Sequence, residues 1–444
     1  MQFSKTLLAC MSIYLFHSFS EARPMPRKNT GVSWGAILIG DQGNKLWPGS
    51  ATIYDLAIME KQGLRSAALA TKPWSDSYWP IMYGAAAWRY ADPKFPKSKD
   101  FNVNYEFYRK NPSATVPADK RSPAEKYDVL VGDMDFKLTK YNWGKGVRTV
   151  ESNGSVAAWE GLCAGWAPAS FLESEPQKSI TVKAMNGELI TFTPSDLKAL
   201  TTLLWDSPLF YVDFVGTKCV SKEPREDEIG RDLQSECLTT NPGTWHMTVV
   251  NRIGVDKKSF VMDKTYDQEI WNQPIYSYQY DYFNPQTSES SESLLEAIVP
   301  VSRYPRDRFK KYRASNTAYV VGIRMSVTYT VENQPSTLSV PLKTELAHDL
   351  YVYDLELDSD YKIIGGEWHS KVHPDFLWAP APGSYPLSRG ESEMGVKMTW
   401  NPEEAIPREL IDASRKSSPL GQPVRGILDG LLKLSRAQRS TELQ

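Results

Sequence analysis

Hydrophobic and polar residues follow two different periods along the chain. In "TPSDLKALTTLLWD", residues 193–206, apolar positions recur at helical spacing, and Thr193 precedes a proline in the first turn. The stretch "RSPAEKYDVLVGD" starts in the same way, with Ser122 as the capping residue and Glu125 in the first turn. A short polar side chain before a proline, followed by an acidic residue, is typical of a helix start. We therefore predict capped helices in both places.

Elsewhere the period is two. "SITVKAM" (179–185) and "ELITFT" (188–193) flank an Asn-Gly pair, which is a strong signal for a hairpin. Alternating, β-branched residues also predict that 244–250 and 258–263 are paired strands. Residues 317–366 repeat this pattern with turns between the runs, so we expect them to be all-β.

Breaks in these patterns suggest the domain organisation. "FPKSKDFNVNYEFYRKNPSATVPADK" is charged, proline-rich and non-periodic, and is expected to be a long surface loop. The full division expected is a signal peptide at 1–22, an N-terminal mixed region at 23–121, a core at 122–283, a linker at 284–316, a smaller β-rich C-terminal domain at 317–400 and a polar tail with a short amphipathic helix at 401–444.

The N-terminus indicates export. Lys5 precedes the apolar stretch 7–16, and small residues follow, which is the pattern of a cleaved signal peptide. We therefore expect a secreted or periplasmic protein, and no later stretch is long and apolar enough to span a membrane. The net charge of only −2 provides no basic field for a phosphate backbone, which argues against nucleic-acid binding.

The cysteines raise the question of chemistry. Cys219 and Cys237 flank a charged loop and would most economically form a disulfide in an oxidising compartment. Cys163, in "WEGLCAGWAPAS", is left without a partner. Such a cysteine is either reactive or buried and inert, and both readings stay open on residue types alone.

A nucleophilic cysteine needs a base and a favourable field. A helix beginning near Cys163 would supply the field, although Pro168 implies that this helix begins nearer Ala167 or is kinked. If the strands at 244–250 and 258–263 pair, His246 faces Asp263, which could hold the imidazole in the right tautomer. His369, His373 and Asp375 could share a face, but no further ligand completes a metal site, and none is predicted.

Several of these stretches carry a resemblance. "GLCAGWAPAS", "TPSDLKAL", "HMTVVN", "SFVMD" and "EIWNQPIYSY" resemble the transglutaminase elicitor family of oomycetes and its secreted bacterial relatives. The resemblance implies an α+β fold with a papain/transglutaminase-like cysteine core, in which a helix packs on an antiparallel sheet. It also implies that Cys163 is the nucleophile, His246 the base and Asp263 the orienting acid, and that Trp159 helps to bind substrate or the oxyanion.

Three functions follow. The first is a secreted acyltransferase that forms a thioester with a protein glutamine and passes it to a lysine amine or to water. The second is a cysteine peptidase or amidase with the same triad, and the third is a non-enzymatic binding protein. No cofactor is expected, and calcium dependence is left open. The expected partners are proteins bearing glutamine and lysine.

Overall fold

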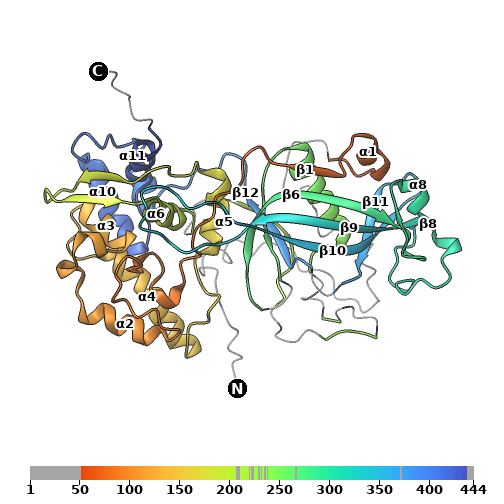
Figure 1. The fold of residues 1–444 in the computed structure, drawn as a ribbon, viewed down its shortest axis with the longest axis horizontal. Helices are drawn as coiled ribbons and strands as arrows, with labels where there is room; N and C mark the ends of the chain where they lie inside the picture. The colour runs from red at the N-terminus through yellow and green to blue at the C-terminus, as the bar shows by residue number, and fades with distance from the viewer. Residues whose placement is uncertain are drawn as a thin grey trace.

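The chain folds into a helical half and a β half that lie side by side (Figure 1). The computed structural model describes residues 52–206, 211–219, 221, 225–228, 231, 233–234, 237, 239–265, 268–370 and 373–437. The helical half contains α2 (Phe101–Lys110), α3 (Pro123–Leu130), α4 (Lys137–Asn153), α5 (Cys163–Leu172), α6 (Pro194–Asp206), α9 (Arg389–Met394), α10 (Arg408–Ser417) and α11 (Arg425–Arg436), with the hairpin of β2 (Ile180–Lys183) and β3 (Leu189–Phe192).

The β half is built on one antiparallel sheet. In order across the sheet, its strands are β11 (Ile363–Trp368), β10 (Leu346–Leu357), β9 (Tyr319–Thr330), β6 (Asn272–Phe283), β5 (Val261–Asp263), β12 (Phe376–Pro380) and β4 (Val212–Gly216). Shorter pieces complete this half: α1 (Leu56–Lys61), β1 (Ser66–Ala68), α7 (Pro242–Val249), a π-helical turn (Val250–Val255), β7 (Ser290–Ser291), α8 (Leu294–Ala297) and β8 (Val299–Pro300). Single 3-10 turns occupy Ile81–Tyr83, Ala85–Ala87, Ser113–Thr115, Ala118–Lys120, Val301–Arg303 and Ser418–Leu420.

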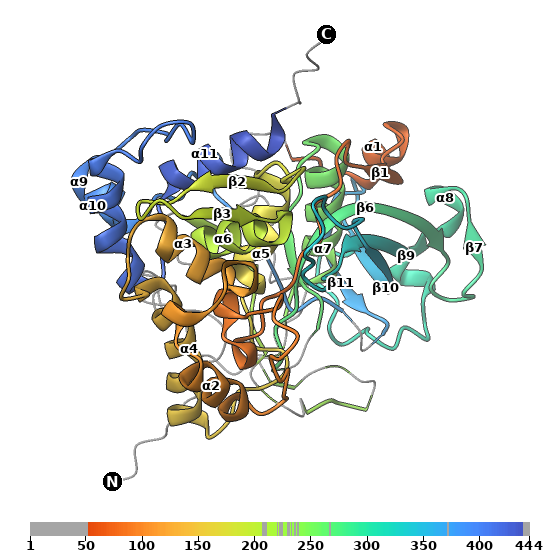
Figure 2. The same cartoon turned by 60° about the vertical axis from the view of Figure 1, so that its left-hand side comes forward.

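The capped helices and the hairpin are confirmed. Ser122 and Glu125 form a reciprocal capping box at the start of α3. Thr193 and Asp196 do the same at α6, where the Asp196 carboxylate accepts from the Thr193 amide at 2.8 Å and the Thr193 hydroxyl accepts from the Asp196 amide at 3.2 Å. The β2–β3 hairpin turns at Gly187, whose φ of 87° suits glycine. It lies over α3 and α6 and shares their core (Figure 2).

Two stretches fold differently from expectation. Part of the expected surface loop is helix α2, which Asp100 caps by accepting from the Asn102 amide. Its aromatic residues recur at helical spacing and stack near Trp143, a pattern hidden among charged residues. Residues 244–250 are not a strand either. They lie in α7 and the following π-helical turn, because Asn241 caps a helix that has Pro242 at its first position.

The expected domain boundary at 284–316 does not separate two sheets. β6, from the expected core, pairs with β9, from the expected C-terminal domain, from Ile275 to Phe283. The tail expected at 401–444 is also part of the fold. Its amphipathic helix is confirmed as α11, and Ile427, Leu428 and Leu431 are buried in the core of the helical half. The expected signal peptide lies outside the described residues. Among the helices that are described, none has the length and apolarity needed to cross a membrane.

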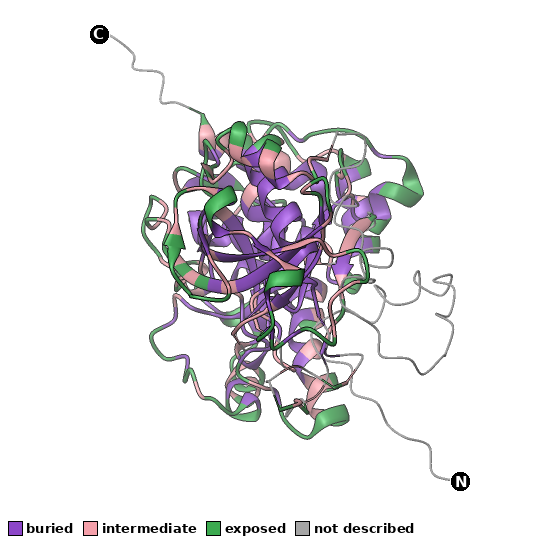
Figure 3. Ribbon diagram, turned by 90° about the vertical axis from the view of Figure 1, so that its right-hand side faces the viewer, coloured by how far each residue is buried: buried purple, intermediate pink, exposed green. Residues whose placement is uncertain are grey.

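Helix α5 lies at the junction of the two halves. One core fills the helical half and another fills the β half, and buried residues dominate the interior (Figure 3). A smaller apolar cluster joins Ala167 of α5 to Val261 of β5 and Trp378 of β12. On its other side α5 packs so closely on α6 that a Cβ added to Gly165 would lie 2.3 Å from the Thr202 carbonyl oxygen. The first residue of α5, Cys163, therefore faces the sheet.

Candidate active site

Cys163 is the first residue of α5, and its side chain is 1% exposed. The cysteine is free of any disulfide. No side-chain hydrogen bond caps α5, since the N-cap residue is Leu162, whose amide donates to the Tyr78 carbonyl at 2.6 Å. Pro168 lies inside the helix without preventing its start at Cys163, so of the two expected alternatives the start near Ala167 is wrong. The thiol thus lies at the positive end of a ten-residue helix dipole.

The sulfur contacts the start of β6. The side-chain amide of Asn272 donates to Cys163 Sγ at 3.4 Å, and Sγ lies 3.9 Å from the carbonyl oxygen of Ile270. Asn272 is itself held from the far side, because the indole N–H of Trp378 donates to Asn272 Oδ1 at 2.7 Å. A buried amide with its oxygen bonded in this way can present only its NH₂ group to the thiol. Three elements, α5, β6 and β12, therefore fix the geometry of the sulfur.

Asp263 is the neighbour of Asn272 across the sheet. It ends β5, and the two residues are register partners. Asp263 Oδ1 accepts from the Trp271 amide at 2.9 Å, while Oδ2 is buried without a hydrogen-bond partner among the described residues. Burial raises the pKa of Asp263 to about 7, against the opposing effects of the Trp271 and Thr265 hydrogen bonds. A carboxyl group with this pKa can gain and lose a proton near neutral pH.

The thiol is neutral in this state. Burial raises the pKa of Cys163 to about 11; the hydrogen bond from Asn272 lowers it, and the nearby carboxylates of Glu332 and Asp263 raise it further. The helix N-terminus was expected to favour the thiolate. Here the loss of solvent around the sulfur outweighs that field, because a buried anion has neither water nor a cation to stabilise it.

Trp159 lies in the apolar cluster at this junction. Its side chain is 8% exposed and shares that cluster with Ile270, Val261 and Trp378. Ile270 is the residue whose carbonyl oxygen faces Cys163 Sγ, so Trp159 belongs to the same apolar cluster as one of the sulfur's neighbours.

His246 is not part of this arrangement, and its expected pairing with Asp263 is wrong. Its ring lies in the β-half core, where Nδ1 is 2.8 Å from the Tyr353 hydroxyl and the ring meets Tyr280 edge-on at 4.7 Å. Tyr280 is eight residues along β6 from Asn272, a separation of about 26 Å in an extended strand. Burial lowers the pKa of His246 to about 3, so the ring is neutral. Helix α7 replaces the expected hairpin, and the register that paired the two residues does not exist.

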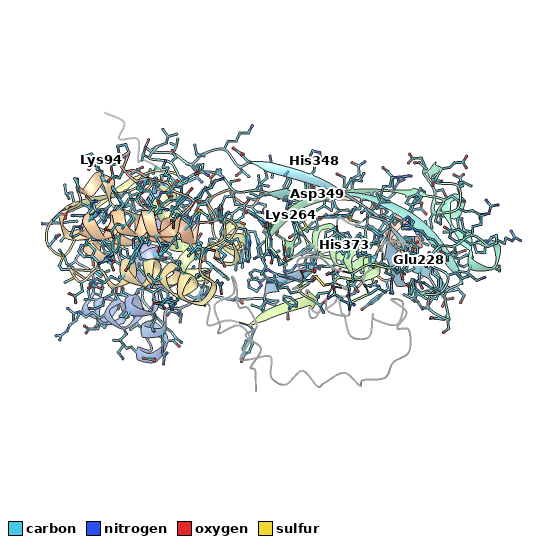
Figure 4. The ribbon with its side chains drawn as sticks, turned by 90° about the horizontal axis from the view of Figure 1, so that it is seen from below. Lys94, Glu228, Lys264, His348, Asp349 and His373 are labelled. Atoms are coloured by element: carbon cyan, nitrogen blue, oxygen red, sulfur yellow. A yellow bond between two sulfur atoms is a disulfide. The ribbon has the colours of Figure 1, made fainter. Side chains whose placement is uncertain are left out.

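The other described histidines belong to the β half (Figure 4 labels His348 and His373). His369 Nε2 is 2.8 Å from Asp354, and His373 stacks on Trp368 at 5.0 Å. Asp375, the expected companion of these two, accepts from the Cys219 amide at 2.8 Å. Within the described ranges, no group of three or more His, Cys, Asp or Glu side chains could hold a metal ion.

The disulfide between Cys219 and Cys237 is confirmed. It connects to the site through Asp375, because the Asp375 amide donates to the Asp263 carbonyl at 3.0 Å while the Asp375 carboxylate receives the Cys219 amide. Cys219 is thereby attached to the end of the strand that carries Asp263.

Sequence reasoning missed Asn272 and Trp378. Asn272 stands in "EIWNQPIYSY", and an asparagine next to a tryptophan at the start of a run rich in apolar and aromatic residues was a usable signal. Trp378 could not be found, because 106 residues separate it from Asn272 and only the sheet brings the two together.

A comparison with models of protein families shows the family. The model of the family described as "Transglutaminase elicitor" matches residues 52–399. Among solved structures, the GP42 transglutaminase from Phytophthora sojae is similar, with a TM-score of 0.54 and 19% sequence identity over 86% of this chain and 99% of that one. The mixed fold of helices and antiparallel sheet is thus shared with that structure. Among curated proteins, no relative matches the sequence.

Proposed function

Because the chain belongs to the transglutaminase elicitor family, we propose that it is a cysteine acyltransferase that acts on the side-chain carboxamide of protein-bound glutamine. The observation that supports this most directly is the buried constellation of Cys163, Asn272 and Asp263 at the junction of the two halves. These residues supply a nucleophile, a hydrogen-bond donor and a titratable carboxyl group, and Asn272 links the other two because it contacts the sulfur and is the register partner of Asp263.

The first step forms a thioester. Cys163 Sγ attacks the glutamine carboxamide carbon while Asp263 takes the thiol proton, and a tetrahedral intermediate with a negative oxygen forms. The C–N bond then breaks, and ammonia leaves with the proton that Asp263 returns. The pKa of Asp263, about 7, suits a group that accepts and then donates a proton.

The second step releases the enzyme. An amine, such as that of a lysine side chain, attacks the thioester carbon, and the C–S bond breaks as the sulfur regains a proton. The product is an isopeptide bond. Water in place of the amine gives glutamate, which is deamidation.

Asn272 has two roles in this scheme. In the resting state its NH₂ group holds the sulfur in place. In the intermediate the new oxyanion stands one bond from the carbon attached to sulfur, within reach of the same NH₂ group and of the amide of Cys163 at the start of α5. Trp378 fixes the orientation of Asn272, which makes it a positioning residue. Trp159, in the apolar cluster at this junction, contributes to binding the glutamine side chain.

The resting arrangement is closed. A thiol that is 1% exposed and has a raised pKa does not meet a protein substrate without a movement that uncovers it. Binding of the glutamine-bearing segment provides this opening. It also brings the carboxamide into contact with the sulfur, where Asp263 and the helix dipole promote the attack.

We propose that the protein acts outside the cytoplasm. The disulfide between Cys219 and Cys237 persists in oxidising compartments, where glutamine and lysine side chains of extracellular proteins are the available substrates. The described part contains no helix that spans a membrane.

The direct test is incorporation of a labelled primary amine into a glutamine-bearing protein, together with release of ammonia. Wild type, C163A and C163S are compared, with calcium and with a chelator, because calcium dependence is open. Cys163-dependent incorporation supports the proposal, and equal incorporation by wild type and C163A would end it. Cleavage of the substrate chain without ammonia release would instead identify a peptidase.

A further inference from the structure

A cavity of about 660 Å³ lies at the opposite end of α5 from Cys163. Its walls come from both halves: the end of α5 and the residues that follow it, the end of α11, the segment 69–74, and the segment that includes Arg252 and 257–259. Helix α5 has ten residues, so the cavity is about 14 Å from the thiol. Its volume falls in the range of small-molecule sites.

The walls of this cavity carry an excess of positive charge. The cationic residues that line it are Lys72, Arg252, Lys257, Lys258 and Arg436, and they come from separate segments of the chain. The lysines at 257 and 258 are exposed at the rim, and Arg252 is buried at 6% exposure.

The two carboxylates in the lining do not neutralise this charge, because other cations hold them. Glu173 Oε1 receives Arg425 Nη1 at 2.5 Å and the indole N–H of Trp205 at 3.0 Å. Glu175 Oε1 receives Lys198 Nζ at 2.7 Å. Each carboxylate of the lining is therefore paired with a cation from outside the lining.

The two arginines are poorly satisfied. Arg436 Nε and Nη2 are buried without a hydrogen-bond partner in the part of the chain that the structure describes. Arg252 Nε makes one long hydrogen bond, 3.4 Å, to the Ser259 carbonyl. Burial lowers the pKa of both guanidinium groups, and it outweighs the opposing effect of nearby carboxylates, Asp256 and Asp213 for Arg252 and Glu173 and Asp429 for Arg436. Buried donors without acceptors destabilise a fold, and their retention around a ligand-sized cavity is explained by a ligand that accepts from them.

We propose that this cavity binds an oxyanion, the carboxylate or phosphate group of a small molecule, between Arg252 and Arg436. Planar guanidinium groups match both kinds of anion with paired hydrogen bonds. Lys257 and Lys258 attract the anion at the rim, and Leu69, Pro73 and Phe171 provide an apolar wall for the rest of the ligand. The site does not depend on the chemistry proposed for Cys163.

Calorimetric titration tests this with two probes, pyrophosphate for phosphate ligands and citrate for carboxylate ligands. At about 20 mM salt, where screening is weak, wild type binds at least one probe saturably. R436Q weakens that binding by about tenfold, because a charged donor pair is lost. R408Q, which removes an arginine with a 90% exposed side chain on α10, leaves it unchanged.

Each outcome decides the proposal. Binding of pyrophosphate alone assigns a phosphate ligand, and binding of citrate alone assigns a carboxylate. Thermal melting checks that R436Q folds. If R436Q does not fold, K258Q, a change at the exposed rim, takes its place and is expected to weaken binding about threefold. Absence of saturable heat with both probes, or unchanged affinity in R436Q and K258Q, would overturn the site.

Discussion

The side-chain amide of Asn272 donates to the sulfur of Cys163 at 3.4 Å, although 109 residues separate the two in the chain. This contact joins the first residue of α5 to the first residue of β6, and so joins the helical half of the molecule to its sheet. Asp263 lies on the adjacent strand β5, and Trp378 lies on β12, the next strand beyond it. Four predictions follow from this arrangement and from its difference from the expected triad.

Asn272 is expected to contribute to catalysis by stabilising the transition state. In N272A the donor to sulfur and to the proposed oxyanion is lost, so kcat for amine incorporation falls by about 10²–10³ with little change in KM. W378F keeps the ring but loses the N–H that orients Asn272, and a smaller fall, about tenfold, is expected.

The control is N284A, in a turn of the β half where Asn284 accepts from backbone amides. It should retain wild-type kinetics. If N272A unfolds at a lower temperature yet turns over at the wild-type rate, Asn272 is structural and has no part in the reaction.

Asp263 makes the free energy of unfolding depend on pH. Its folded-state pKa, about 7, lies above the ordinary value of 3.8, so the folded state holds the proton more tightly than the unfolded state. The stability tied to the neutral carboxyl is fully present below about pH 4 and is lost as pH rises through about 7. D263N is neutral at every pH and is expected to exceed wild type in unfolding free energy by about 2–4 kcal/mol at about pH 8.

Urea unfolding at about pH 4 and about pH 8 measures this, and at the lower pH the two proteins should agree. The same variant should lose at least about 100-fold in activity, since the proposed proton acceptor is gone. D281N, at an exposed position paired with Arg65, serves as the control. An equal stability difference at both pH values would contradict the raised pKa.

The Cys163 thiol should be slow toward alkylating reagents at neutral pH. With a pKa of about 11 in place of 9.0, its ionised fraction at neutral pH is about 100-fold below that of an ordinary cysteine, and burial slows access further. The rate of modification by iodoacetamide should rise about tenfold for each pH unit up to about 10. A glutamine-bearing peptide should accelerate it by uncovering the sulfur. Rapid, pH-independent modification of the free protein would show instead that the resting thiol is already ionised.

A change at His246 distinguishes the arrangement seen in the structure from the expected triad of Cys163, His246 and Asp263. H246Q keeps a hydrogen-bonding group for the Tyr353 hydroxyl, so a loss of about 1–2 kcal/mol in stability is expected. Its kcat should stay within about twofold of wild type, because the ring lies in the β-half core. The measurement is kcat beside D263N in the same assay. A fall in H246Q as large as that in D263N, with folding intact, would restore the imidazole as the base.

The sequence by itself determined the local elements and singled out the candidate nucleophile. Capping residues and helical spacing specified α3 and α6, and Asn-Gly specified the β2–β3 turn, because these signals act within a few residues of the chain. Cys163 could be singled out because its two companions pair with each other.

Only the tertiary structure decided what surrounds that cysteine. The β-branched run at 244–250 reads as a strand, but its asparagine cap and its burial make it helix α7, and this removes His246 from Asp263. Asn272 and Trp378 reach the sulfur and each other through the order of strands in one sheet, to which local propensity is blind. The charge state of Cys163 was decided in the same way, because desolvation depends on every residue packed around the thiol and not on the helix that carries it.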